Sequence, residues 1–366
     1  MAIIFNLRGS SLQFFTANIV IAFVLWVLTI TIYVATHAIT ALVIGANIYI
    51  IRIGSGPEIF EKTIYGFQFS IGKFLIGGSY RIAFSDLNGL KRRGLFLYGS
   101  GIVVHALLTL FLLPRFNFSD LNTTFAFETI FFLTNAYFLF RSVIPRKTDL
   151  TGTFVDNNAS YIRALLTQPD YAAQLHAAYF HIEGGKAYDE KKYDRAFQLS
   201  EDGLKLYPQN FALQISHSFL LYKMGHSLES IQIMEELLAA PNLSLGEKAS
   251  LYNNLSWILL INNYDIKKAL DYAKRAYAVL PWEATVEGTL GAALIESGQY
   301  EQGLGLVLQA YEHHEIQSSK ATNLAFAAIS SHYLGDHQAA VDYFGRAIAI
   351  DSTADGIVNA QRVLGK

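Results

Sequence analysis

Residues 253 to 281, NNLSWILLINNYDIKKALDYAKRAYAVLP, decide the fold of the second half of this chain. Two small residues, Ala269 and Ala276, stand seven positions apart. Seven positions are about two helical turns, so both residues share one face, where a second helix can approach closely. Pro281 ends the stretch, because a proline inside a helix removes a backbone hydrogen bond and clashes with the preceding turn. The stretch therefore predicts a pair of helices followed by a break.

The same pattern recurs on both sides of this stretch. Small residues recur 34, 39, 34 and 37 positions apart, at Ala196, Ser230, Ala269, Gly303 and Ala340. A second small residue follows seven positions later in four units, at Gly203, Ala276, Ala310 and Ala347. Glycines mark the turn within three pairs, at Gly225, Gly298 and Gly335. The spacing resembles the tetratricopeptide repeat, with about five units over residues 172–352 and a cap after them; an unrelated helical array is the alternative.

The first half of the chain has a different composition. No Asp, Glu, Lys or Arg occurs between Arg8 and Arg52. About 20 apolar residues cross a bilayer, and we predict three spans, at about 14–45, 94–113 and 125–144. Residues 47–84 alternate β-branched and aromatic residues with polar ones, which predicts a small β-sheet at the membrane interface. We expect a mainly α protein: a membrane domain over 1–166 and an α-solenoid of repeats over 167–366.

The charges of the chain predict its orientation and exclude some functions. Lys and Arg flank the spans on one side, at Lys91, Arg92, Arg93, Arg141, Arg146 and Lys147, whereas the loop over 114–124 has only Arg115. We therefore expect the N-terminus outside and the repeats in the cytoplasm, in a bacterial cytoplasmic membrane. The apolar start should be retained as a span, because it is too long for a signal peptide. A net charge of −2 gives no case for nucleic acid, and the lack of cysteine excludes disulfides and thiolate zinc sites.

Four motifs follow one another in the membrane domain. They are THAITALVIGA at 36–46, IGSGPEIF at 53–60, GSGIVVH at 99–105 and VIPRKTDLTGTFVDNNASYIRALL at 143–166. In this order they resemble the site-2 protease family of intramembrane zinc metalloproteases, whose first core span carries H-E-x-x-H. The resemblance covers residues 14–166. It implies zinc-dependent cleavage of a membrane-spanning or membrane-anchored peptide.

The resemblance also implies roles for particular positions. His37 matches the first zinc ligand, and Asp156 matches the aspartate ligand, with Asp149 as the competing assignment. Ala38 stands at the position of the glutamate base and Ala41 at that of the second histidine ligand. Methyl groups neither bind zinc nor take a proton from water. We therefore expect this chain to hold zinc weakly or not at all and to be inactive as a protease.

Several alternatives remain open at this point. The two alanines are typical either of a natural pseudoprotease or of a deliberately disarmed enzyme. His105 is either a replacement ligand or a histidine that packs between helices. The membrane domain is alternatively an unrelated three-span anchor. In that case, and equally in a pseudoenzyme, the chain is a non-enzymatic adaptor that uses its repeats to bind a partner.

The first helices of the repeat pairs carry the candidate partner-binding residues. They are His217 and Tyr222 in the second unit, Asn253 and Asn254 in the third, and Asn323 in the fifth. Asparagine both donates and accepts hydrogen bonds, which suits the backbone of a bound peptide. The expected partner is a cytosolic peptide or protein; the alternative is that these residues are ordinary polar surface.

Overall fold

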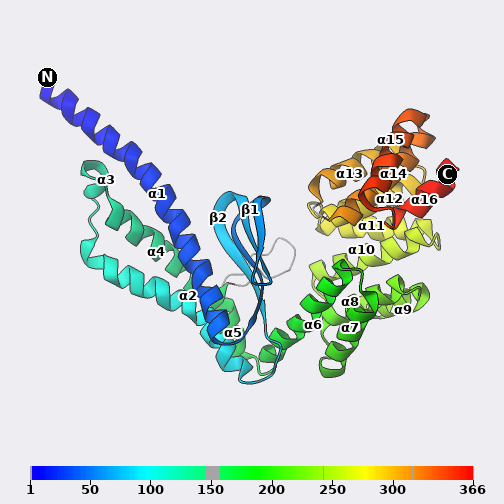
Figure 1. The fold of residues 1–366 in the computed structure, drawn as a ribbon, viewed down its shortest axis with the longest axis horizontal. Coiled ribbons are helices and arrows are strands. Elements are labelled where there is room, and N and C mark those ends of the chain that lie inside the picture. The colour runs from blue at the N-terminus through cyan, green and yellow to red at the C-terminus, as the bar shows by residue number, and fades with distance from the viewer. Residues whose placement is uncertain (1, 145–156, 242, 315, 366) are drawn as a thin grey trace. The chain divides into compact units, whose positions relative to one another are not determined.

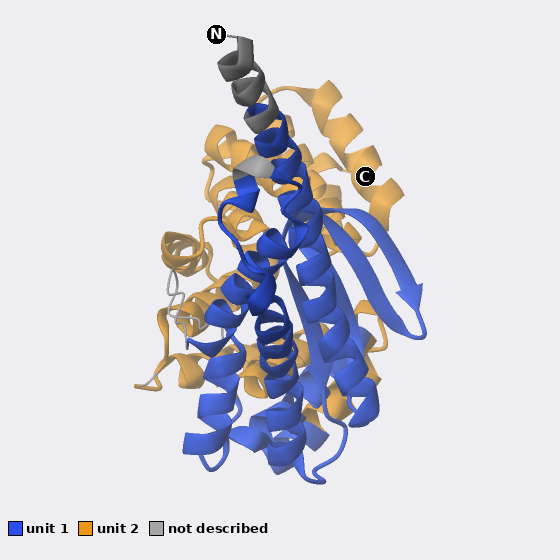
Figure 2. Ribbon diagram, turned by 90° about the vertical axis from the view of Figure 1, so that its left-hand side faces the viewer, with its two compact units in different colours: residues 1–148, 154–186, 202–210 blue, residues 149–153, 187–201, 211–366 orange. Residues whose placement is uncertain are grey.

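A computed structural model describes residues 2–144, 157–241, 243–314 and 316–365 (Figure 1). The chain is mainly helical and separates into two compact units (Figure 2). The first unit holds the described residues up to 144, with 157–186 and 202–210. The second unit holds residues 187–201 and the described residues from 211 onward.

Long apolar helices dominate the first unit. They are α1 (Ala2–Val43), α2 (Leu90–Leu112), which continues into the 3₁₀ turn η1 (Leu113–Arg115), and α4 (Phe127–Val143), which follows the short α3 (Asp120–Thr123). Two segments of the described chain are long and apolar enough to cross a membrane, Leu12–Val43 and Leu90–Arg115. The third expected span corresponds to α4, whose 17 residues extend about 25 Å, less than the roughly 30 Å of a hydrocarbon core. The structure therefore has two candidate spans where the sequence predicted three.

The predicted small sheet is present as a hairpin of β1 (Asn47–Ile64) and β2 (Phe67–Ala83), which pair antiparallel. The register shifts repeatedly between Ile53 and Phe60, within the IGSGPEIF motif. Gly54 and Gly56 have φ of 88° and 76° there, a backbone conformation that favours glycine. Because both strands bend, Ile51 pairs with Tyr80 and also with Phe69. The motif therefore folds the hairpin back on itself.

Helix α5 (Asn158–Thr167) packs against the apolar helices α2 and α4. Asn157 caps it by accepting a hydrogen bond from the backbone N–H of Ser160. The amide of Asn157 also donates to the carbonyl oxygens of Arg141 and Ile144 at the end of α4. This one side chain thus fixes the start of α5 against the end of α4.

Five successive helix pairs form the rest of the described chain. They are α6 (Tyr171–Asp189) with α7 (Tyr193–Leu206), α8 (Phe211–Lys223) with α9 (Ser227–Leu238), α10 (Leu245–Ile261) with α11 (Ile266–Val279), α12 (Ala284–Glu296) with α13 (Tyr300–His313), and α14 (Gln317–Tyr333) with α15 (His337–Asp351). Helix α16 (Gly356–Leu364) follows and packs on α14, where Ile357 and Ala360 are buried. The expected tetratricopeptide-like repeats are therefore present.

The small residues of the repeat lie where the helices of a pair cross. Ala196, Ser230, Ala269 and Ala340 are at most 1% exposed. A Cβ on Gly303 would lie 2.7 Å from the carbonyl oxygen of Gly291 in α12, so only glycine permits this crossing. The turn before each second helix has a positive φ in all five pairs, at Lys191, Gly225, Asn263, Gly298 and Gly335. The sequence pattern identified the three glycines and missed Lys191 and Asn263.

Candidate functional site

His37 is fully buried in α1 and has hydrogen-bond partners at both ring nitrogens. Its Nδ1 lies 2.8 Å from the backbone carbonyl oxygen of Tyr33, which can only accept, so Nδ1 carries the proton. Its Nε2 lies 3.2 Å from the side-chain amide nitrogen of Asn158 and therefore accepts from it. The lone pair that a metal ion would need is thus engaged by an N–H group.

Asn158 completes a closed hydrogen-bond network around His37. Its Oδ1 accepts from the hydroxyl groups of Tyr33 at 3.2 Å and Tyr80 at 3.1 Å, and the residue is 2% exposed. Tyr80 also stacks on the imidazole of His37, with ring centroids 4.4 Å apart. Sequence reasoning missed Asn158 and singled out Asp156, two positions earlier. Asp156 and Asp149 both lie outside the described residues.

Gly101 brings α2 against this network. A Cβ at Gly101 would stand 2.4 Å from the imidazole Cε1 of His37, so any side chain there would collide with the ring. Ala41, one turn after His37 in α1, is fully buried in a cluster that includes Leu97. Ala38 is half-buried against a different cluster, which contains Ile51 of the hairpin. The two alanines therefore face different surroundings, and His37 alone of the three contributes a polar group.

His105 does not join His37. The ring of Tyr33 contacts both histidines, with its centroid 4.5 Å from that of His37 and 6.0 Å from that of His105. The Nδ1 of His105 is 2.8 Å from the Oδ1 of Asn135, and both residues are fully buried. Within the residues that the structure describes, no group of three or more His, Cys, Asp or Glu side chains is placed to hold a metal ion.

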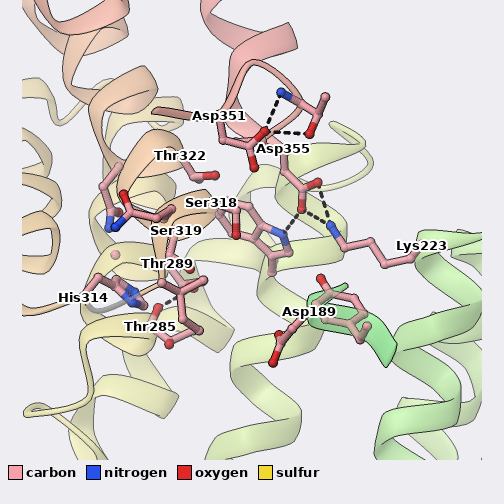
Figure 3. Close-up of a pocket in the computed structure, with 18 of the residues that line it drawn as sticks. Asp189, Lys223, Thr285, Thr289, His314, Ser318, Ser319, Thr322, Asp351 and Asp355 are labelled. Carbon is pink, nitrogen blue, oxygen red and sulfur yellow. Dashed lines mark hydrogen bonds and ion pairs between the residues drawn. The ribbon is translucent and has the colours of Figure 1, made fainter. Parts of the chain in front are cut away.

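The second unit contains a cavity of about 610 Å³ (Figure 3). The first helix of every pair contributes to its wall, as does the segment before α16. Uncharged polar residues form much of the wall: Asn253, Asn254, Thr285, Thr289, Gln317, Ser318, Ser319, Thr322 and Asn323. Three of the five residues predicted to bind a partner, Asn253, Asn254 and Asn323, therefore line one cavity.

Asn253 and Asn323 are both largely buried in this wall. Asn253 is 6% exposed, and its Oδ1 has no hydrogen-bond partner in the described structure. Asn323 is 4% exposed, and its Oδ1 would lie 2.6 Å from a Cβ at Gly288. Gly288 thus makes room for the Asn323 side chain. The wall therefore contains the carboxamides of Asn253 from α10 and Asn323 from α14, together with Gly288 from α12.

The other two predicted residues do not line the cavity. The Nδ1 of His217 is hydrogen-bonded to the hydroxyl of Ser200 at 2.9 Å, and its ring stacks on Phe197, with ring centroids 4.8 Å apart. Burial lowers the pKa of His217. Tyr222 is 8% exposed and donates to the carboxylate of Asp355 at 3.0 Å. His217 and Tyr222 thus hold helices together, a role that their position in first helices did not reveal.

Comparisons with known proteins give a limited picture. No protein-family model matches the chain, and no curated protein matches it. Solved structures with similarity include YrrB, described as a TPR protein with an unusual peptide-binding site (16% identity, 50% of this chain and 90% of that one, TM-score 0.33). Another is TTC0263, a thermophilic TPR protein of Thermus thermophilus (19% identity, 52% and 100%, TM-score 0.41). The tetratricopeptide-like character of the second unit rests on its own helix pairs and small crossing residues.

Proposed function

We propose that this chain is a non-enzymatic docking protein whose repeat array binds a peptide segment of a partner. The observation that carries the proposal is the polar cavity, whose wall includes the asparagines 253, 254 and 323. Helices α1 and α2, which are long and apolar enough to cross a bilayer, would hold the array at a membrane.

The chemistry of the wall suits a peptide backbone. A backbone offers an N–H donor and a C=O acceptor at each residue, and a carboxamide can pair with both. The volume of about 610 Å³ lies in the range of known ligand sites, roughly 300–1,000 Å³.

A second candidate function is the zinc-dependent intramembrane cleavage that the site-2 protease resemblance implies. His37 and position 41 lie one turn apart on α1, and Gly101 gives α2 close access to His37, which favours a metalloprotease-like scaffold. Ala38 and Ala41 supply neither base nor ligand, and Asn158 engages Nε2 of His37. In this proposal the membrane unit is a pseudoprotease or a disarmed protease that holds a membrane peptide without cutting it.

A peptide-display experiment tests the docking function. A library of random 12-residue peptides is selected on the full chain in lipid nanodiscs, with empty nanodiscs as counter-selection. The selected peptide should bind the triple variant Asn253→Ala, Asn254→Ala, Asn323→Ala roughly 100-fold more weakly, because two or three hydrogen bonds of about 1 kcal/mol each are lost.

The matched control replaces three exposed glutamines outside the cavity by alanine, at Gln302, Gln338 and Gln361. This control should bind the peptide as the unmodified chain does. Full affinity in the asparagine variant, with its helical circular dichroism unchanged, would place peptide binding elsewhere and end the proposal.

A further inference from the structure

Two lysines of the cavity wall are paired with a short acidic segment of the same chain. The Nζ of Lys223 lies 2.7 Å from both carboxylate oxygens of Asp355. The Nζ of Lys191 lies 3.2 Å from a carboxylate oxygen of Asp351 and 2.9 Å from the hydroxyl of Thr353. Both lysines belong to the first two helix pairs, whereas the aspartates flank the sequence STA after the last pair.

Asp355 is bound as a ligand carboxylate would be (Figure 3). Besides Lys223, its Oδ2 accepts from the indole N–H of Trp257 at 3.1 Å and from the hydroxyl of Tyr222 at 3.0 Å. Asp355 precedes the first residue of α16, the position where aspartate usually caps a helix. Its side chain makes no capping hydrogen bond to α16 and instead faces donors of α8 and α10. The helix pairs thus contain a built site for a carboxylate.

Asp351 forms the second half of this contact. Its carboxylate accepts from the backbone N–H and the hydroxyl of Thr353 and from Lys191. Burial alone would raise the pKa of Asp351, but these hydrogen bonds and the charge of Lys191 hold it below its ordinary value. The side chain of Asp351 is 13% exposed, whereas that of Lys191 is 55% exposed, so the lysine remains within reach of solvent and of a competitor.

We infer that residues 351–355, DSTAD, are an internal ligand of the cavity and that the partner is an acidic peptide whose carboxylates replace those of Asp351 and Asp355 at Lys191 and Lys223. This inference rests on the proposed docking function and names the chemistry of its partner. A tethered ligand has a high effective concentration, so it keeps the lysine end of the cavity closed to weak competitors. Without these carboxylates Lys191 and Lys223 lose their ion pairs, and an external acidic peptide then binds them more tightly.

The probe is a peptide that carries the sequence of the internal ligand. A fluorescein-labelled peptide IDSTADG, residues 350–356, is titrated against the full chain in nanodiscs. We expect weak binding to the unmodified chain and binding at least about tenfold tighter to the variant Asp351→Asn with Asp355→Asn. The neutral peptide INSTANG should bind neither protein. The control Asp342→Asn removes an exposed aspartate that pairs with Arg346, and it should leave binding at the unmodified level.

Two further variants keep the result decisive. Lys191→Gln with Lys223→Gln, added to the double aspartate variant, should abolish binding of IDSTADG. If that variant unfolds by circular dichroism, Asp351→Asn alone should still give a smaller gain, because its partner Lys191 is half-exposed. Equal binding of IDSTADG to the unmodified and aspartate variants, or equal binding of both peptides, would overturn the inference. Library peptides that still require Asn253, Asn254 and Asn323 would in that case leave the docking function intact.

Discussion

At the scale of single residues, the His37 network and Asn253 of the cavity wall differ in how their hydrogen bonds are satisfied. Around His37 every nitrogen and oxygen of the described network has a partner, because Asn158 links the imidazole to two tyrosine hydroxyl groups. In the cavity wall, Asn253 keeps an acceptor without a partner. The second unit is the better candidate for ligand binding because it contains the polar cavity, whereas Asn158 engages the imidazole of His37.

The metal site of the protease-like candidate can be tested by restoring its residues. We predict that Ala38→Glu with Ala41→His binds one zinc ion together with His37, whereas the unmodified chain binds far less. The reason is that two histidines four positions apart share one helix face. Metal analysis of both purified proteins measures this.

The same analysis assigns the third ligand. Asp156→Ala in the restored protein should lose zinc, and Asp149→Ala should keep it; the reverse result would exchange the two aspartates. Equal stoichiometric zinc in the restored and unmodified chains would refute His37 and Ala41 as ligand positions.

Glu287 predicts a pH dependence of stability in the second unit. It is 2% exposed, its Oε1 has no partner in the described chain, and its Oε2 lies 3.3 Å from His313. Burial raises the pKa of Glu287, and the contact with His313 lowers it in part. Because the pKa is higher in the folded state, the protonated form favours folding, and this contribution is lost as pH rises through the folded pKa.

We therefore expect Glu287→Gln to be more stable than the unmodified chain at pH 7, and we expect this difference to shrink at pH 4 as Glu287 becomes protonated. Urea unfolding followed by tryptophan fluorescence at the two pH values measures the difference. The exposed Glu301→Gln serves as the control and should show no such change. A Glu287→Gln protein that is less stable at pH 7 would show that the contact with His313 outweighs the cost of burial.

At the scale of elements, one helix contains two glycines in opposite environments. A Cβ at Gly303 of α13 would meet the backbone of α12, whereas a Cβ at Gly305 would have nothing within 4 Å. Alanine lowers the conformational entropy of the unfolded chain relative to glycine. The position that faces another helix and the position that faces open space should therefore respond oppositely to the same substitution.

We predict that Gly305→Ala stabilises the second unit by about 0.5–1 kcal/mol. Gly303→Ala should destabilise it by about 1–3 kcal/mol, because the added methyl group separates α12 from α13. The midpoints of urea unfolding compare the two variants directly. Equal stabilisation by both would mean that the two helices do not cross at Gly303.

At the scale of the whole molecule, the number of membrane spans decides which side of the bilayer each unit faces. The lysines and arginines around α2 and α4 predict that the repeats are cytoplasmic. With three spans the loop over 114–124 lies on the opposite side from the repeats. If only α1 and α2 cross, that loop and the repeats lie on the same side.

Reporter fusions decide between these arrangements. We expect a reporter within residues 116–124 to be outside and a reporter after Lys366 to be cytoplasmic, provided that the 17-residue α4 crosses the bilayer by local thinning. Reporters on the same side would leave α4 as a helix that packs on α1 and α2 without crossing. A fusion within the hairpin, at Gly66, serves as an internal control and should share the side of the repeats.

Sequence alone determined the helix pairs of the second unit and the hairpin of the first. Small residues seven positions apart indicate one face of a helix, and alternation of apolar with polar residues indicates a strand. Both patterns follow from the geometry of the backbone. For the same reason the glycines at 225, 298 and 335 were recognised as turns, while Lys191 and Asn263, which adopt the same conformation, were not. Glycine marks such a turn in the sequence. A turn is therefore missed where a residue of another type adopts the positive φ.

Only the tertiary structure decided which side chains meet. Asn158 lies 121 positions from His37, and Asp355 lies 132 positions from Lys223. No sequence period relates such pairs, since their contact follows from how whole helices pack. His217 and Tyr222 illustrate the same limit, because their helices were predicted but the direction of each side chain depends on its neighbours. The carboxamides at 253, 254 and 323 line one cavity because successive helix pairs stack on one another. The repeat spacing in the sequence predicts this stacking.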